Sequence, residues 1–222
     1  MSYGVRLEVW GDYALFTRPE MKVERVSYDV MTPSAARGLL EAIYWHPGMR
    51  WHIDHIHVLS PIRFTNIRRN EVSSKIKASD LRRALNGSGE LPCISTKEDI
   101  QQRASLVLKD VHYVIEAHFA LTDQANSTDN VGKFSDIIRR RIEKGQTFHQ
   151  PCFGCREFPA HFRFWPGEEI PVAGELYEQA EKDLGFMLYD MDYSDPENIR
   201  PQFFRAVLRK GVLNCNDCEV YL

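Results

Sequence analysis

Hydrophobic and polar residues alternate over several short stretches of the chain, a period-two pattern that is typical of β-strands. One such stretch runs through residues 5–9, and a longer one runs from Lys109 to Leu121. In the longer stretch the odd-numbered positions from Val111 onward carry apolar side chains and the even-numbered ones are mostly polar. Successive strand residues point to opposite faces, so the polar side chains should share one open sheet face. They are Asp110, His112, Glu116 and His118.

Two segments have the three-to-four residue spacing of hydrophobic positions that is typical of amphipathic helices. The first is predicted to begin at Thr32-Pro33, an N-cap followed by proline at the first helical position, and to stop before Pro47. The second is predicted from Phe134 to Ile142 and is closed by Gly145.

The remaining segments give weaker signals. Residues 51–59 are rich in β-branched and aromatic residues but alternate poorly, which predicts a strand with a bulge or with burial on both faces. Residues 63–89 are predicted to form a long basic loop ending in a short helix over 80–85. Farther along, strand-like pieces at 157–165 and 203–213 are predicted to form a small second sheet.

This order of elements indicates an α+β protein with a ferredoxin-like layout similar to an RNA-recognition motif. Its antiparallel sheet would carry helices on one face and leave the other face free. A ferredoxin-like domain is therefore predicted over residues 1–148, followed by a small C-terminal β-sheet domain over residues 149–222. The length of 222 residues is sufficient for a proper core.

The whole-chain composition argues against a nucleic-acid partner, because the 28 Lys and Arg residues are outnumbered by 31 Asp and Glu residues, for a net charge of −3. The charges are nevertheless divided along the chain. Residues 168–222 contain 12 acidic and 5 basic residues, whereas residues 1–167 contain 19 acidic and 23 basic ones. Clustered bases attract a phosphate backbone whatever the total charge is. The residues expected to bind RNA are Arg63, Arg68, Arg69, Lys75, Lys77 and Lys109.

Other classes of protein are excluded by composition. A hydrophobic content of 43% and a charged content of 27% are ordinary for a globular protein. No stretch approaches 18 uncharged apolar residues, so no membrane span is expected. Residues 1–16 contain Glu8 and Asp12 and no apolar core of a secretory signal, which favours a cytoplasmic location.

Metal chemistry is not the favoured interpretation of the cysteines and histidines. Two Cys-x-x-Cys pairs, at 152–155 and 215–218, could hold a structural zinc, but 59 residues separate them and reduced thiols are the default. In a strand, His55 and His57 would share one face while His52 and Asp54 share the other, so no three-ligand set is predicted.

Common catalytic motifs such as a P-loop or a nucleophile elbow are absent from the sequence. Metal-free RNA cleavage needs only a base, an acid and a cation, since RNA supplies its own 2′-hydroxyl nucleophile. Tyr44, after the first helix, and His118, on the open sheet face, could meet in this fold. Tyrosine would act as a base only if neighbouring cations lowered its pKa. Purely structural roles for both residues remain the alternative.

Several strings of the sequence resemble a known family, the CRISPR-associated Cas-five proteins of subtype I-C, also called the Dvulg type. The order of the strings also fits, and they span most of the chain. They are Gly11-Asp-Tyr-Ala-Leu-Phe16, Ser27-Tyr-Asp-Val-Met-Thr-Pro-Ser34, Ala42-Ile-Tyr-Trp-His-Pro-Gly48, Arg68-Arg-Asn-Glu71 and Gly154-Cys-Arg-Glu-Phe158.

The resemblance implies a RAMP fold and a metal-independent endoribonuclease without a cofactor. Such a protein cuts pre-crRNA at the base of the repeat hairpin and stays on the crRNA 5′ handle with the other Cascade subunits. By resemblance, Tyr44 is the general base or an orienting group and His118 is the general acid. The family's Lys-Ala-His strand differs here, because Glu116 stands at the lysine position and the cation must come from elsewhere, such as Lys109, Arg63 or Arg68.

Two alternatives stay open from the sequence. A non-catalytic subunit that holds the crRNA 5′ handle is favoured by Glu116, whose carboxylate would repel phosphate. A sequence-nonspecific partner, double-stranded DNA, would also suit the basic surface.

Overall fold

The computed structural model describes residues 4–21, 23–195 and 197–222. The chain divides into two compact units, which are described separately. The first comprises Met1–Thr65 and Leu106–Leu222, and the second comprises Asn66–Ser105.

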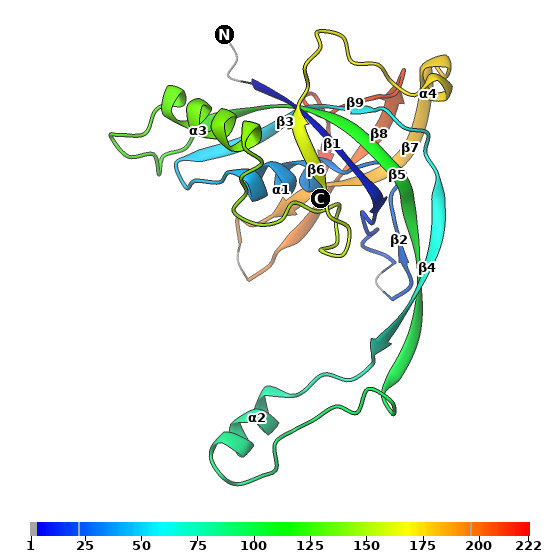
Figure 1. Cartoon of the computed structure of the whole chain (residues 1–222), viewed down its shortest axis with the longest axis vertical. Coiled ribbons are helices and arrows are strands. Elements are labelled where there is room, and N and C mark those ends of the chain that lie inside the picture. Colours follow the sequence, from blue (N-terminus) through cyan, green and yellow to red (C-terminus); the bar gives the residue numbers. More distant parts are fainter. Residues whose placement is uncertain (1–3, 22, 196) are drawn as a thin grey trace. The chain divides into compact units, whose positions relative to one another are not determined.

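An antiparallel sheet forms the centre of the first unit (Figure 1). Four of its strands lie in the order β3-β5-β1-β6, and each pair of neighbours is antiparallel. The strands are β1 (Gly4–Ala14), β3 (Met49–Val58), β5 (Ile100–Leu121) and β6 (His161–Phe164). A two-residue strand, β2 (Arg25–Val26), also pairs with β5.

The alternation in β5 produces the two faces that the sequence predicts. Val111, Tyr113, Ile115, Ala117 and Phe119 are buried. His112, Glu116 and His118 are partly exposed on the other face. The strand is longer than predicted, because its first residues continue into the second unit.

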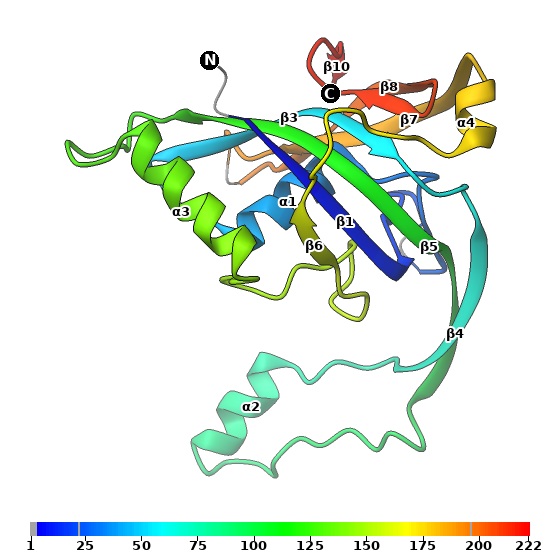
Figure 2. The same cartoon turned by 45° about the horizontal axis from the view of Figure 1, so that its top comes forward.

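Both predicted helices are confirmed, and they contact each other against the sheet (Figure 2). α1 (Pro33–Ile43) begins at Thr32, whose hydroxyl accepts a hydrogen bond from the Ala35 amide at 3.2 Å. α3 (Val131–Glu143) begins at Asn130, and its Phe134 packs against Phe119 of β5 with ring centroids 6.2 Å apart. Neither these nor any other described helix is long and apolar enough to cross a membrane.

The C-terminal strands extend the same sheet beyond β3. β9 pairs with β3, β8 pairs with β9, and both β7 and β10 pair with β8. They are preceded by a short helix, and the bounds are α4 (Gly174–Glu178), β7 (Glu181–Asp192), β8 (Arg200–Arg209), β9 (Val212–Asn214) and β10 (Val220–Tyr221).

One sequence prediction for this region is wrong. The pieces at 157–165 and 203–213 do not form a second sheet. β6 pairs with β1 at the edge of the main sheet, and β8 and β9 belong to that same sheet on the other side of β3. The domain boundary at residue 148 stays a prediction. The two compact units divide the chain at other positions.

The second unit contains most of β4 (Phe64–Val72), all of α2 (Ala78–Leu85) and the first residues of β5, with which β4 pairs. Its helix has no buried residue. The helix predicted over 80–85 is confirmed as part of α2. The loop predicted over 63–79 is wrong where the chain forms the strand β4. This strand is polar on both faces, so it has no hydrophobic period to detect.

Candidate active site

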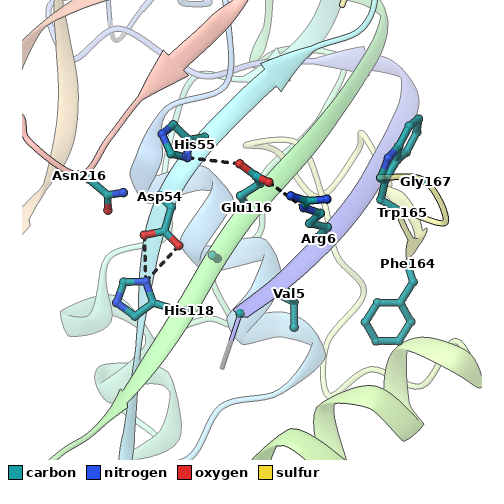
Figure 3. A pocket seen from close by; sticks show the side chains of 12 residues that line it. Val5, Arg6, Asp54, His55, Glu116, His118, Phe164, Trp165, Gly167 and Asn216 are labelled. Atoms are coloured by element: carbon teal, nitrogen blue, oxygen red, sulfur yellow. Dashed lines mark hydrogen bonds and ion pairs between the residues drawn. The ribbon is translucent and has the colours of Figure 1, made fainter. Parts of the chain in front are cut away.

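A groove of about 820 Å³ lies on the open, polar face of the sheet (Figure 3). Its floor is formed by β1, β3 and β5. On β1 and β5, the even-numbered polar residues point away from the helices. The groove brings together the titratable side chains of Arg6, Asp54, His55, Glu116 and His118, with Asn216 beside them.

His118 is held by a carboxylate. Its Nδ1 lies 2.8 Å from Oδ1 and 3.0 Å from Oδ2 of Asp54, and its ring stacks on His52 at 5.1 Å between centroids. About a third of the side chain is exposed, and Nε2 makes no hydrogen bond to another described residue. A carboxylate on Nδ1 fixes the tautomer and leaves Nε2 to exchange a proton with a ligand.

A β-bulge brings Asp54 to this face. The pairing register between β3 and β5 shifts between Ile53 and His55, which places His52 opposite His118 and His55 opposite Glu116. The predicted bulge is thus confirmed. The prediction that His52 and His55 lie on opposite faces is wrong. The extra residue of the bulge shifts the alternation by one position, so that His55 points to the polar face of the sheet.

Glu116 is the centre of a second cluster. Its Oε1 accepts from Nε of Arg6 at 2.7 Å, and its Oε2 lies 3.3 Å from Nδ1 of His55 and 3.2 Å from Nε2 of His57. Partial burial raises the pKa of this carboxyl. The His57 hydrogen bond and the charges of His57 and Arg6 together lower the pKa by more, so the net shift is downward. Glu116 is therefore an ionised anchor for its three partners.

Arg6 is the only Lys or Arg among the described residues that line this groove. It sits directly opposite Glu116 in the register of β1 and β5, and its Nη1 donates to the Glu168 carbonyl at 3.0 Å. Sequence reasoning missed it, although its place in the alternation of the first strand put it on the polar face. Lys109 is not at the groove; it pairs with Tyr13, nine residues along β5 from His118.

Tyr44 lies on the other face of the sheet. Its ring contacts Phe134 of α3, and its carbonyl accepts from Trp51 Nε1 at 3.0 Å. Burial raises the pKa of its phenol despite the nearby charges of Lys133 and Arg141. The structure does not bring Tyr44 to His118, and the lowered pKa that a tyrosine base would need is absent.

Comparisons with known proteins agree on one family. A family model described as a CRISPR-associated protein (Cas_Cas5) matches residues 4–216. The chain belongs to the Cas5d family. A protein of Mannheimia succiniciproducens named CRISPR pre-crRNA endoribonuclease Cas5d is 49% identical over 96% of this chain and 95% of its own length. A Thermus thermophilus protein of the same name is 40% identical, covering 94% of this chain and 90% of its own length.

Solved structures show the same fold. A CRISPR-associated protein has a TM-score of 0.66 at 23% identity, covering all of this chain and 97% of that one. A functionally uncharacterized Streptococcus mutans protein has a TM-score of 0.69 at 22% identity, covering all of this chain and 98% of that one. A chain of a CRISPR RNA-guided surveillance complex has a TM-score of 0.50 at 12% identity, covering 98% of this chain and 89% of that one.

No disulfide joins the cysteines of this Cas5d-family chain among the described residues. The second pair bonds locally, Cys215 to the Leu213 carbonyl and Cys218 to the Asn214 carbonyl. Burial raises the pKa of both thiols. Among the residues that the structure describes, no three His, Cys, Asp or Glu side chains are placed to hold a metal ion.

The predicted RNA-binding residues are divided between the two units. Arg63 and Lys109 belong to the first, where the Arg63 carbonyl accepts from the Lys109 amide at 2.9 Å. The other four belong to the second unit, where Arg68 is exposed and Arg69 is half-buried on the opposite face of the strand. The four are Arg68, Arg69, Lys75 and Lys77.

Proposed function

We propose that this chain is a pre-crRNA endoribonuclease that cuts CRISPR repeat RNA without a metal or a cofactor. The relatives that carry this activity in their names match nearly the whole chain. The observation that carries the proposal is His118, an imidazole whose Nδ1 is held by Asp54 while Nε2 is left without a partner among the described residues.

The reaction that suits this groove is an internal transfer within the RNA. The 2′-oxygen attacks the adjacent phosphorus and loses its proton to a base, the bond from phosphorus to the 5′-oxygen breaks, and the acid protonates that oxygen. The products are a 2′,3′-cyclic phosphate and a 5′-hydroxyl end. His118 is the acid in this proposal, Asp54 holds its imidazole in position, and Arg6 stabilises the charge on the pentacoordinate phosphorus.

Tyr44 is assigned the role of base or orienting group by the family resemblance alone. It is 7% exposed and packs on the helical side of the sheet. A direct role would require the RNA or the chain to reach the helical face of the sheet as well as its open face.

The proposed fold assignment is a ferredoxin-like RAMP domain with a C-terminal β-domain. The strand order β6-β1-β5-β3, with α1 after β1 and α3 after β5, supports it, because this is the antiparallel order of a β-α-β-β-α-β unit. The exposed bases of the second unit support binding to the repeat hairpin through its phosphates.

After cleavage, we propose, the chain stays on the crRNA 5′ handle as a subunit of the type I-C Cascade complex. The fold likeness to a chain of a surveillance complex is consistent with this assembly. Cysteines that form no disulfide suit a reducing cytoplasm. A non-catalytic handle-binding subunit is the second candidate, favoured by the Glu116 carboxylate inside the groove.

Cleavage of cognate repeat RNA in EDTA tests the proposal. The wild type should cut the RNA, H118A should lose at least about 100-fold in rate, and the exposed-histidine control H149A should cut normally. Intact RNA that binds tightly to the wild type would instead establish the non-catalytic subunit. Displacement of the repeat RNA by an equal mass of double-stranded DNA would contradict both and favour a DNA partner.

A further inference from the structure

We infer that His55 is a second catalytic residue of the groove, the general base that takes the 2′-hydroxyl proton while His118 protonates the leaving 5′-oxygen. The inference rests on the proposed endoribonuclease function and supplies the proton acceptor that the position of Tyr44 leaves open. Glu116 is the positioning residue for His55.

Each of the two imidazoles has a carboxylate beside its Nδ1, hydrogen-bonded at 2.8 Å in His118 and in ion-pair contact at 3.3 Å in His55. The carboxylate is that of Asp54 for His118 and that of Glu116 for His55 (Figure 3). Each side chain is 36% exposed and lines the same groove. In both, Nε2 makes no hydrogen bond to another described residue and can face a ligand.

Their spacing suits a phosphate. Glu116 and His118 are two residues apart on one face of β5, and His55 is paired with Glu116, so the two histidines are diagonal neighbours across β3 and β5. Such positions lie about 7–8 Å apart in a sheet. A scissile phosphate beside the two rings would place the attacking 2′-oxygen of its ribose near one ring and the leaving 5′-oxygen near the other. Arg6 lies across Glu116 from His55 and lines the same groove.

The other candidates for the base are less well placed. His52 stacks on His118, and burial together with the charge of His118 lowers its pKa. His57 shares the same Glu116 oxygen, but its side chain is only 13% exposed and does not line the groove. The charged groups that face His55 are Glu116, His57, Arg6 and Asp54.

The protons balance over one turnover. His55 accepts the 2′-hydroxyl proton as the new phosphorus–oxygen bond forms, and His118 gives its proton to the 5′-oxygen as the old bond breaks. Exchange with water through the open groove then returns both rings to their starting states.

A substrate with sulfur in place of the leaving 5′-oxygen separates the two roles, because a thiolate leaves without being protonated. With ordinary repeat RNA, H55A and H118A should each lose at least about 100-fold in the single-turnover rate. With the sulfur substrate, H118A should recover to within about tenfold of the wild type, whereas H55A should stay slow. The control H149A, which removes an exposed histidine outside the groove, should remain close to the wild type on both substrates.

Two further measurements keep the result interpretable. H55N retains a donor toward Glu116 but cannot take up a proton, so it should be as slow as H55A while melting at the wild-type temperature. Both variants should bind a non-cleavable 2′-deoxy repeat as tightly as the wild type. A wild-type rate in H55A, or rescue of H55A by sulfur, would overturn the inference about His55 alone, whereas failure of the wild type to cut would overturn the proposed function itself.

Discussion

At the scale of single residues, the groove consists of imidazoles and a guanidinium held by two carboxylates. Asp54 accepts a hydrogen bond from Nδ1 of His118 and so limits the rotation of that ring, and Glu116 lies 3.3 Å from Nδ1 of His55. The cost is negative charge close to a phosphate. Arg6 offsets one of these charges and still has Nη2 without a hydrogen-bond partner among the described residues.

We expect R6A to lower the single-turnover cleavage rate by about 100-fold or more, because removing one donor to a developing oxyanion has an effect of this size. R6K keeps the charge without the planar fork and should fall between R6A and the wild type. The matched control is R163A, which removes an exposed arginine that is bound to Glu8 and lies outside the groove. Equal losses in R6A and R163A would show a general charge effect and contradict a specific role for Arg6.

At the scale of secondary-structure elements, local patterns predicted the parts of the chain that have one buried face. Thr32-Pro33 marked the start of α1, and the alternation around His118 identified β5. The polar strand β4 and the edge strand β6 were missed or misplaced, since pairing between distant segments leaves no local signal. The register shift on β3 could be predicted as irregularity, but its effect on His55 could not.

Glu8 links the strands β1, β5 and β6 through its side chain. It is 2% exposed on β1, and its carboxylate binds His112 of β5 and Arg163 of β6. The Arg163 hydrogen bond lowers the pKa of Glu8 below its ordinary value of 4.5, and the contact with His112 lowers it further against an opposing effect of burial.

We expect E8Q to destabilise the protein by about 1 kcal/mol at pH 7, a modest effect because the Arg163 partner is well exposed to solvent. A carboxyl whose pKa is lower in the folded state stabilises the fold above the unfolded-state pKa, and the effect is lost as pH falls through the folded-state pKa. The difference between E8Q and the wild type should therefore shrink from pH 7 to pH 3 in urea unfolding. A difference that is constant with pH would show that shape, not charge, matters at this position.

At the scale of the whole molecule, charge is divided by segment in a way that the net value of −3 conceals. The second unit carries 8 basic and 5 acidic residues, whereas residues 168–222 carry 5 and 12. The sequence alone identified these clusters but not which bases are available. In the structure Arg68, Lys75 and Lys77 are exposed, and none of them lines the groove.

We therefore expect the triple variant R68Q/K75Q/K77Q to weaken binding to repeat RNA without changing the cleavage rate at saturating protein. Each lost phosphate contact releases about 0.7–0.9 fewer counterions, so the slope of log affinity against log salt should become shallower by about 2–3. The control R205Q/R209Q/K210Q removes the same number of exposed bases from the acidic C-terminal segment and should leave the slope near the wild-type value. Equal slopes in the wild type and in R68Q/K75Q/K77Q would exclude the second unit from the RNA path. A slower saturating rate would mean that these bases also position the scissile phosphate, because a purely electrostatic contact changes occupancy and leaves the chemical step untouched.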